Sequence, residues 1–152
     1  METADLHLRN QLCFALYTAA RATATAYREA LAETQLTFPQ YLVMLALWEN
    51  DGLTVSELGT ELHLDSGTLS PLLTRLETNG YVTRSRPERD GRRVVVQLTA
   101  AGKELRAVAE QIHCAIVEHL DMPEAEVIEL RDMATRLTGL IQGRVAGQRG
   151  RE

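Results

Sequence analysis

The segment from Leu53 to Glu77 constrains the fold of this 152-residue chain more than any other stretch. Thr54, with Glu57 three residues later, has the spacing of a capping box, which predicts the start of a short helix. Leu64-Asp65 predicts a turn, and a second helix should follow, capped by Asp65 or Ser66. Two helices joined by such a short turn are typical of a helix-turn-helix.

The second of these helices has two chemically different faces. Four leucines at helical spacing should face inward: Leu69, Leu72, Leu73 and Leu76. The outer face carries short hydroxyl side chains and one long cation: Ser66, Thr68, Ser70, Thr74 and Arg75. Small polar side chains let a helix approach base edges and phosphates in the major groove of DNA. A helical hairpin with a merely solvated face is the competing interpretation.

A β-hairpin with a basic tip should follow Asn79-Gly80. Residues 81–86 alternate at the period of a strand, and residues 94–98 are rich in β-branched side chains. Between Arg84 and Arg93, five arginines face only two carboxylates, a local charge of +3 in a chain of net charge -5. A basic hairpin after a helix-turn-helix predicts a winged helix whose tip enters the minor groove. A solvated arginine-rich turn is the alternative.

The remaining chain is predicted to be helical. Long helices are expected over residues 5–33, from Phe38-Pro39 to Asn50, from Thr99 to about Leu120 and from Pro123 to about Arg144. Their predicted apolar stripes are Leu12, Leu16, Ala19 and Tyr27; Tyr41, Leu42, Leu45 and Trp48; and Leu105, Val108, Ile112 and Ile116. The sequence therefore predicts a mainly α protein with a small β-hairpin wing. Residues 37–99 would form the winged helix-turn-helix DNA-binding region, and residues 1–36 and 100–152 a helical dimerisation region, in one intertwined domain.

Composition indicates the class of protein and the cellular compartment to expect. Hydrophobic residues make up 45% of the chain, which is enough for a packed core. No apolar run approaches the roughly 18 residues of a membrane span, and the acidic N-terminus does not have the pattern of a signal peptide. We therefore expect a cytoplasmic protein whose two cysteines are free or redox-active.

Cys13 is the residue with the most specific surroundings. Because each helical residue turns about 100°, Tyr17 and Tyr27 should lie about 40° to either side of Cys13 on one face. Phenol hydroxyls on the face of a thiol can hydrogen-bond the thiolate, which is the reactive form. On spacing alone, a mixed aromatic core stripe with an inert cysteine is the more common arrangement, because reactive cysteines are the minority.

The chain from about residue 6 to residue 144 resembles the MarR family of dimeric winged-helix repressors. The resemblance is carried by residues 64–84, by Arg89-Asp90-Gly91-Arg92-Arg93 and by Leu98-Thr99-Ala100-Ala101-Gly102. Within the family, residues 11–17, 38–49 and 64–69 are similar to the organic-hydroperoxide sensors of the OhrR type.

This resemblance implies that Cys13 is a peroxide-reactive thiolate held by Tyr17 and Tyr27. Fourteen residues of straight helix rise about 21 Å, so Tyr27 would have to come from an antiparallel helix of a second subunit. In one subclass of the family a second cysteine near the C-terminal helices resolves the sulfenic acid into an intersubunit disulfide. Cys114 is in about the right region for that role, and a spectator thiol is its alternative.

The implied function is a repressor that binds pseudo-palindromic operator DNA as a homodimer. Release would follow when an organic hydroperoxide oxidises Cys13. The predicted DNA-binding residues are Ser66, Thr68, Ser70, Arg75, Arg84, Arg86, Asp90 and Arg92. Arg92 would lie at the tip of the wing, oriented by Asp90.

Three other functions compete with this one. A repressor of the same family could be released by a small phenolic or anionic ligand, with no redox role for Cys13. A thiol peroxidase would need a catalytic His or Asp near Cys13, and the sequence offers none, so no enzyme is expected. His63, His113, Cys114 and His119 are the candidate metal ligands, but their helical positions diverge, so neither a metal site nor a cofactor is expected.

Overall fold

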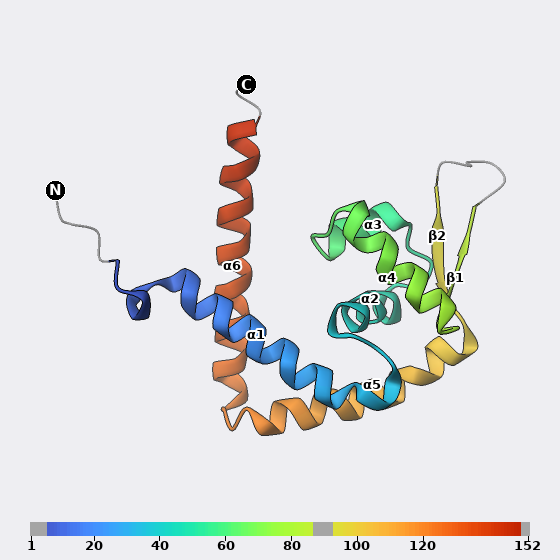
Figure 1. Cartoon of the computed structure of the whole chain (residues 1–152), viewed down its shortest axis with the longest axis horizontal. Coiled ribbons are helices and arrows are strands. Elements are labelled where there is room, and N and C mark those ends of the chain that lie inside the picture. Colours follow the sequence, from blue (N-terminus) through green and yellow to red (C-terminus); the bar gives the residue numbers. More distant parts are fainter. Residues whose placement is uncertain (1–5, 87–92, 150–152) are drawn as a thin grey trace. The chain divides into compact units, whose positions relative to one another are not determined.

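The computed structural model describes residues 6–86 and 93–149, without the side chains of residues 119 and 144–149. The chain divides into two compact units, residues 1–116 and residues 117–152, and each is described by itself. The helices are α1 (Leu12–Ala30), α2 (Phe38–Glu49), α3 (Val55–Glu61), α4 (Ser66–Thr78), α5 (Ala100–His119) and α6 (Glu124–Arg149) (Figure 1). Short 3-10 turns at Leu8–Asn10 and Ala32–Thr34 flank α1. The helices in the described part of the chain include none that is long and apolar enough to cross a membrane.

The start of each helix in the helix-turn-helix is fixed by local hydrogen bonds. The Thr54 hydroxyl accepts from the Glu57 N–H at 3.2 Å, and the Glu57 carboxylate accepts from the Thr54 N–H at 2.7 Å. This is the predicted capping box of α3. Asp65 caps α4 by accepting from the Thr68 N–H at 2.9 Å. Both predicted helix starts are therefore confirmed.

The hairpin completes a winged helix. Strands β1 (Val82–Ser85) and β2 (Val95–Leu98) pair antiparallel, with Val82 opposite Leu98 and Arg84 opposite Val96. The Val96 N–H also donates to the Leu53 carbonyl at 2.8 Å, which ties the hairpin to the segment before α3. The wing tip with Asp90 and Arg92 lies outside the described residues.

The core of the first unit lies between α2, α3, α4 and the hairpin. Its fully buried side chains include Tyr41, Val43, Met44, Leu47, Leu58, Leu69, Leu73, Leu76, Val82 and Val96. Leu72 is half-buried at the edge of this core. The inward-facing leucines of α4 are thus as predicted.

The predicted buried stripe of α2 is partly wrong. Leu42 and Leu45 are 36% and 41% exposed, whereas Val43, Met44 and Leu47 are fully buried. The helix is apolar on nearly every side, so its sequence does not reveal which side faces the core. On α5, Val108 is likewise exposed, and Ala109 takes the buried position beside the half-buried Leu105 and Ile112.

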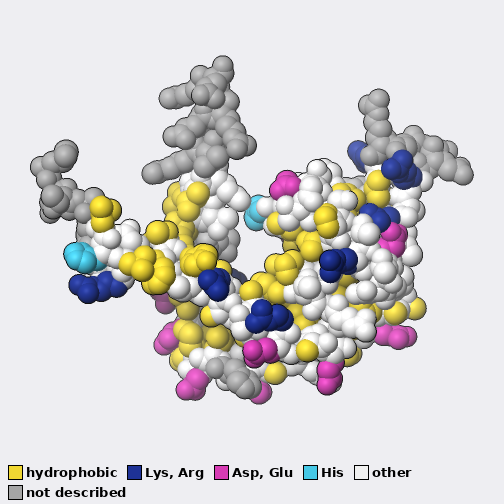
Figure 2. All heavy atoms as spheres, in the orientation of Figure 1, with side chains coloured by type: hydrophobic (Ala, Val, Ile, Leu, Met, Phe, Trp, Pro, Cys, Tyr) yellow, Lys and Arg dark blue, Asp and Glu magenta, His cyan; other side chains and the backbone are white. Residues whose placement is uncertain are grey.

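The first helix also differs from the prediction. It begins at Leu12, after a separate 3-10 turn, and it contains no buried residue. Hydrophobic side chains lie exposed along it (yellow in Figure 2), and Leu12 and Leu16 are 61% and 40% exposed. Leu31, directly after the helix, is completely buried. The last helix is longer than expected and ends at Arg149.

Gly102 allows α5 to begin close against the hairpin. Trp48 donates its indole N–H to the Gly102 carbonyl at 2.8 Å, and a Cβ at residue 102 would overlap the Tyr81 carbonyl oxygen. We therefore expect Gly102→Ala to lower the free energy of unfolding by about 2–3 kcal/mol, because buried backbone would have to move. Urea denaturation at one fixed protein concentration measures this. Ala101→Ser, at the exposed neighbouring position, should stay within about 0.5 kcal/mol of wild type, and an equal destabilisation of both variants would contradict the steric explanation.

Candidate functional site

A polar groove runs between α3, α4 and the hairpin. It encloses about 760 Å³, and its lining includes Ser56, Glu57, Ser66, Gly67, Ser70, Arg84, Arg86 and Arg93. Four of the predicted DNA-binding residues, Ser66, Ser70, Arg84 and Arg86, are therefore brought together. Thr68 and Arg75 are exposed on α4 but do not line this groove, and Asp90 and Arg92 are not among the described residues.

The groove has a basic edge along the hairpin. Lys and Arg side chains gather over the hairpin in Figure 2, and Arg86 and Arg93 are exposed there. The pKa of Glu57 is lowered mainly by its hydrogen bonds with Thr54 and to a smaller extent by the charge of Arg93. A concave surface with exposed hydroxyls and arginines suits a phosphate backbone and the base edges beside it.

Thr68 stabilises the first turn of α4, next to the groove. Its N–H and its hydroxyl both donate to Asp65, at 2.9 and 3.0 Å. These bonds lower the pKa of Asp65, and they fix the first turn of α4, where Ser66 and Ser70 are exposed. The hydroxyl of Thr68 is therefore already used within the chain.

Arg84 is also bonded within the chain. Its guanidinium donates through Nε and Nη2 to one carboxylate oxygen of Glu77, at 3.0 and 2.6 Å. Its backbone N–H donates to the other oxygen at 3.0 Å. Side-chain and backbone hydrogen bonds from Arg84 hold the pKa of Glu77 below its ordinary value, so the carboxylate is ionised at neutral pH. No sequence pattern indicates this pair, whose members are seven residues apart on different elements.

Cys13 is exposed in the first turn of α1. Tyr17, four residues later, is 58% exposed, and its hydroxyl accepts a hydrogen bond from Arg21 at 3.2 Å. The Arg21 guanidinium also lies 5.5 Å from the centre of the Tyr17 ring. The structure therefore places Cys13 and Tyr17 on the same exposed end of α1.

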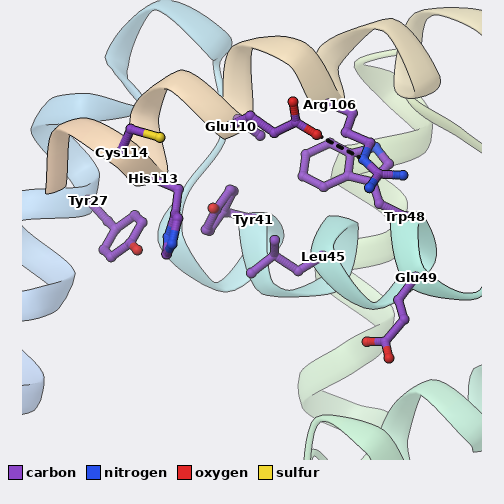
Figure 3. Close-up of a pocket in the computed structure, with 10 residues that line it drawn as sticks. Tyr27, Tyr41, Leu45, Trp48, Glu49, Arg106, Glu110, His113 and Cys114 are labelled. Atoms are coloured by element: carbon purple, nitrogen blue, oxygen red, sulfur yellow. Dashed lines mark hydrogen bonds and ion pairs between the residues drawn. The ribbon is translucent and has the colours of Figure 1, made fainter. Parts of the chain in front are cut away.

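The other two predicted redox residues lie at a separate place. A pocket of about 740 Å³ is lined by Tyr27, Tyr41, Leu45, Trp48, Glu49, Arg106, Ala109, Glu110, His113 and Cys114 (Figure 3). Its walls are mostly apolar, and the ion pair of Arg106 with Glu110, 3.2 Å long, lies on α5. Cys13 and Tyr17 do not line it. Because α1 is unbroken between Cys13 and Tyr27, the two ends are about 21 Å apart.

Tyr27 is held firmly in this pocket. Its ring stacks on Phe38 with centroids 4.9 Å apart and meets Tyr41 at 5.3 Å. Burial raises the pKa of the Tyr27 phenol, so the hydroxyl stays protonated at neutral pH and can donate a hydrogen bond. The sequence had suggested Tyr41 and Trp48 only as core residues. Arg106 and Glu110 are four residues apart on one helix, and this spacing of opposite charges could have predicted their ion pair from the sequence.

Comparisons with known proteins relate this chain to regulators of transcription. The family described as "Transcriptional regulator SarA/Rot" matches residues 25–108. The organic hydroperoxide resistance transcriptional regulator of Bacillus subtilis is 46% identical over 107 residues, covering 70% of this chain and 73% of that protein. The HTH-type transcriptional regulator TtmR of Methylorubrum extorquens is 56% identical over 99 residues. That match covers 65% of this chain, which spans only about half (51%) of the length of TtmR.

Solved structures give the same result. AbfR of Staphylococcus epidermidis is 37% identical with a TM-score of 0.74, covering 89% of this chain and 94% of that one. AbfR has been solved reduced and bound to DNA, overoxidized and bound to DNA, and in a disulfide-formed state. MarR is 26% identical with a TM-score of 0.72, covering 86% of this chain and 96% of that one.

These relatives are regulators of transcription rather than enzymes, and the predicted winged helix-turn-helix fold is confirmed. The chain belongs to the MarR and SarA/Rot group of winged-helix transcriptional regulators.

Proposed function

We propose that this protein is a redox-sensing repressor that binds operator DNA as a homodimer and is released when an organic hydroperoxide oxidises Cys13. The observation that carries the proposal is the placement of the redox residues. Tyr27 and Cys114 line one pocket, whereas Cys13 lies on the same straight helix as Tyr27 but at its far end. Within one chain, Cys13 and Tyr17 therefore lie apart from Tyr27 and Cys114, and neither pair forms a complete site.

A second subunit would complete the site. Leu12, Phe14 and Leu16 are 61%, 37% and 40% exposed around Cys13, and an apolar helix face of this kind is normally covered in the functional assembly. An antiparallel α1 from a second copy would cover it. The same two-fold axis would bring each Cys13 to the pocket that holds Tyr27 and Cys114 of the other subunit. Residues 1–36 and 100–152 would then form the dimerisation region.

The chemistry follows from these positions. The Cys13 thiolate would attack the outer oxygen of the hydroperoxide, giving a sulfenic acid on Cys13 and releasing the alcohol. The protonated hydroxyl of Tyr27 would hydrogen-bond the thiolate before this step. The Cys114 thiol would then attack the sulfur of the sulfenic acid, and water would leave as an intersubunit disulfide forms.

Two hydrogen bonds connect α1 with the DNA-binding surface. The Tyr81 hydroxyl donates to the Thr34 carbonyl at 2.9 Å, and the Asn79 side chain donates to the Gln35 carbonyl at 3.3 Å. Thr34 and Gln35 follow α1, and Asn79 ends α4. A displacement of α1 on oxidation would therefore change the position of α4, the proposed recognition helix, relative to the α4 of the other subunit.

The relatives support the redox function in different ways. The Bacillus subtilis relative is by name an organic hydroperoxide resistance regulator, and AbfR has overoxidized and disulfide forms. The apolar pocket itself favours a second candidate, a repressor released by a small phenolic or anionic ligand that binds near Arg106 and His113. Release of the Cys13→Ser variant by salicylate, with no effect of hydroperoxide on wild type, would identify that second function.

The first test compares DNA binding before and after oxidation. A DNA duplex would be selected from a random library with the reduced protein, and its affinity measured by fluorescence anisotropy. One equivalent of cumene hydroperoxide should weaken binding by about 5- to 150-fold, the range of a typical allosteric coupling. Cys13→Ser should bind the duplex like the reduced protein and show no response. Unchanged affinity of treated wild type would refute the redox function.

The second test concerns the role of Cys114. After treatment with cumene hydroperoxide, wild type should run as a disulfide-linked dimer on non-reducing electrophoresis, since each disulfide joins two subunits. Cys13→Ser and Cys114→Ser should both run as monomers. Intact mass should show a gain of one oxygen in Cys114→Ser, because its sulfenic acid has no resolving thiol. A monomeric band for treated wild type would rule out the resolving role while leaving the first test unaffected.

A further inference from the structure

We propose that Glu77 and Arg84 form a clamp between the proposed recognition helix and the wing, and that Arg84 promotes operator binding by positioning the wing rather than by contacting a phosphate. Arg84 is therefore reassigned from a DNA-contacting residue to a positioning residue. The same applies to Glu77, to which the sequence had assigned no role.

The geometry of the pair supports this assignment. One carboxylate, near the end of α4, receives three hydrogen bonds from a single residue of β1, two from its guanidinium and one from its backbone. The backbone bond fixes the strand itself, and the side-chain bonds fix the direction of the arginine. The two side chains are only 28% and 38% exposed, so the contact is partly shielded from water. The pair thus joins β1 directly to the end of α4, and it adds to the Val96–Leu53 hydrogen bond in fixing the position of the hairpin.

The position of Arg84 on the strand points the same way. Val82 and Arg84 lie at alternate positions of β1, so their side chains share one face of the hairpin, and Arg86 is at the next alternate position, directly after the strand. Along this face burial decreases from the fully buried Val82 through the partly buried Arg84 to the exposed Arg86. Arg84 is therefore the transition between the core and the groove, whereas Arg86 presents its charge to solvent.

Charge provides an independent argument. If Arg84 turned to a phosphate, Glu77 would keep a carboxylate charge near the DNA without its partner, and both the broken hydrogen bonds and the repulsion would oppose binding. As a closed pair, Glu77 and Arg84 carry no net charge. The pair should then release no counterion when DNA binds, unlike an exposed arginine that neutralises a phosphate.

This inference rests on operator binding but not on the redox chemistry, so every measurement is made on reduced protein with the selected duplex. The variants are Glu77→Gln, Arg84→Lys, Arg84→Gln and the charge-neutral double variant Glu77→Gln/Arg84→Gln. Arg86→Gln, two residues later and directly after β1, is the matched comparison. Affinity is measured over a series of salt concentrations, and thermal unfolding verifies that each variant is folded.

The clamp predicts that Glu77→Gln, in which no DNA contact is removed, weakens binding by about 5- to 30-fold, since the pair is broken in both subunits of the dimer. Arg84→Lys should weaken it by a similar factor although it keeps the charge, because an ammonium cannot reproduce the two guanidinium bonds. The double variant should bind no more weakly than Arg84→Gln. Its salt dependence should equal that of wild type, whereas Arg86→Gln should lower the slope by about 0.9 for each phosphate that the arginine neutralises in wild type.

Other results would overturn the clamp. A double variant whose salt slope falls by about 0.9 or more per subunit would show that Arg84 neutralises a phosphate. Glu77→Gln binding within about twofold of wild type, or Arg84→Lys binding like wild type, would show that the pair does not position the wing. Failure of the wild-type protein to select any duplex would instead refute the proposed function itself.

Discussion

The first helix is attached to the rest of its unit at one end, and much of the remaining organisation depends on this. No residue of α1 is buried, but Leu31 directly after it is completely buried, and the Tyr27 ring stacks on Phe38 and makes a tilted contact with Tyr41. The helix therefore leaves the core with an apolar surface that nothing in the described part of the first unit covers. A thiol at the free end and a tyrosine at the anchored end cannot meet within such a chain. Because Cys13 and Tyr27 are at opposite ends of α1, the proposed redox site needs residues from two subunits.

The helix α2 contributes both to the hydrophobic core and to the wall of the apolar pocket. Val43, Met44 and Leu47 pack into the core against α4, whereas Tyr41, Leu45 and Trp48 line the pocket with Tyr27 and Cys114. A helix that packs into the core on one side and lines an apolar pocket on another needs apolar residues on nearly all sides. The helix also helps to fix the start of α5, because the Trp48 indole N–H donates to the Gly102 carbonyl. The pocket and the polar groove between α3, α4 and the hairpin are therefore separate surfaces built on one shared core.

Features of the fold that depend on residues close in sequence could be predicted, whereas features that depend on tertiary packing could not. The helix-turn-helix was predictable because Thr54, Glu57 and Asp65 cap their helices through residues three positions away. The burial of α2 was not, because Leu42 and Leu45 look like core residues in any apolar helix and only the tertiary packing leaves them exposed. The stripe on α1 was correctly predicted to be apolar, but sequence periodicity does not say what covers it. The partnership of Arg84 with Glu77 also needed the structure, since it joins the end of a helix to the following strand.

Tyr81 links the end of α1 to α4 and to the start of α5, so a change at α1 could reach the proposed DNA-binding surface through this one residue. Its backbone N–H donates to the Leu76 carbonyl of α4 at 3.0 Å, and its carbonyl accepts from the Thr99 N–H before α5 at 3.0 Å. Its hydroxyl donates to Thr34 after α1 at 2.9 Å. One residue thus bonds to three segments: the end of α4, the residue before α5 and the turn after α1. Because packed interiors deform little, a shift of α1 must either move Tyr81 and the end of α4 with it or leave polar groups unpaired at about 1–3 kcal/mol each. That cost is similar to a typical allosteric coupling energy, so under the proposed mechanism a small displacement at this residue would be enough to change the placement of α4.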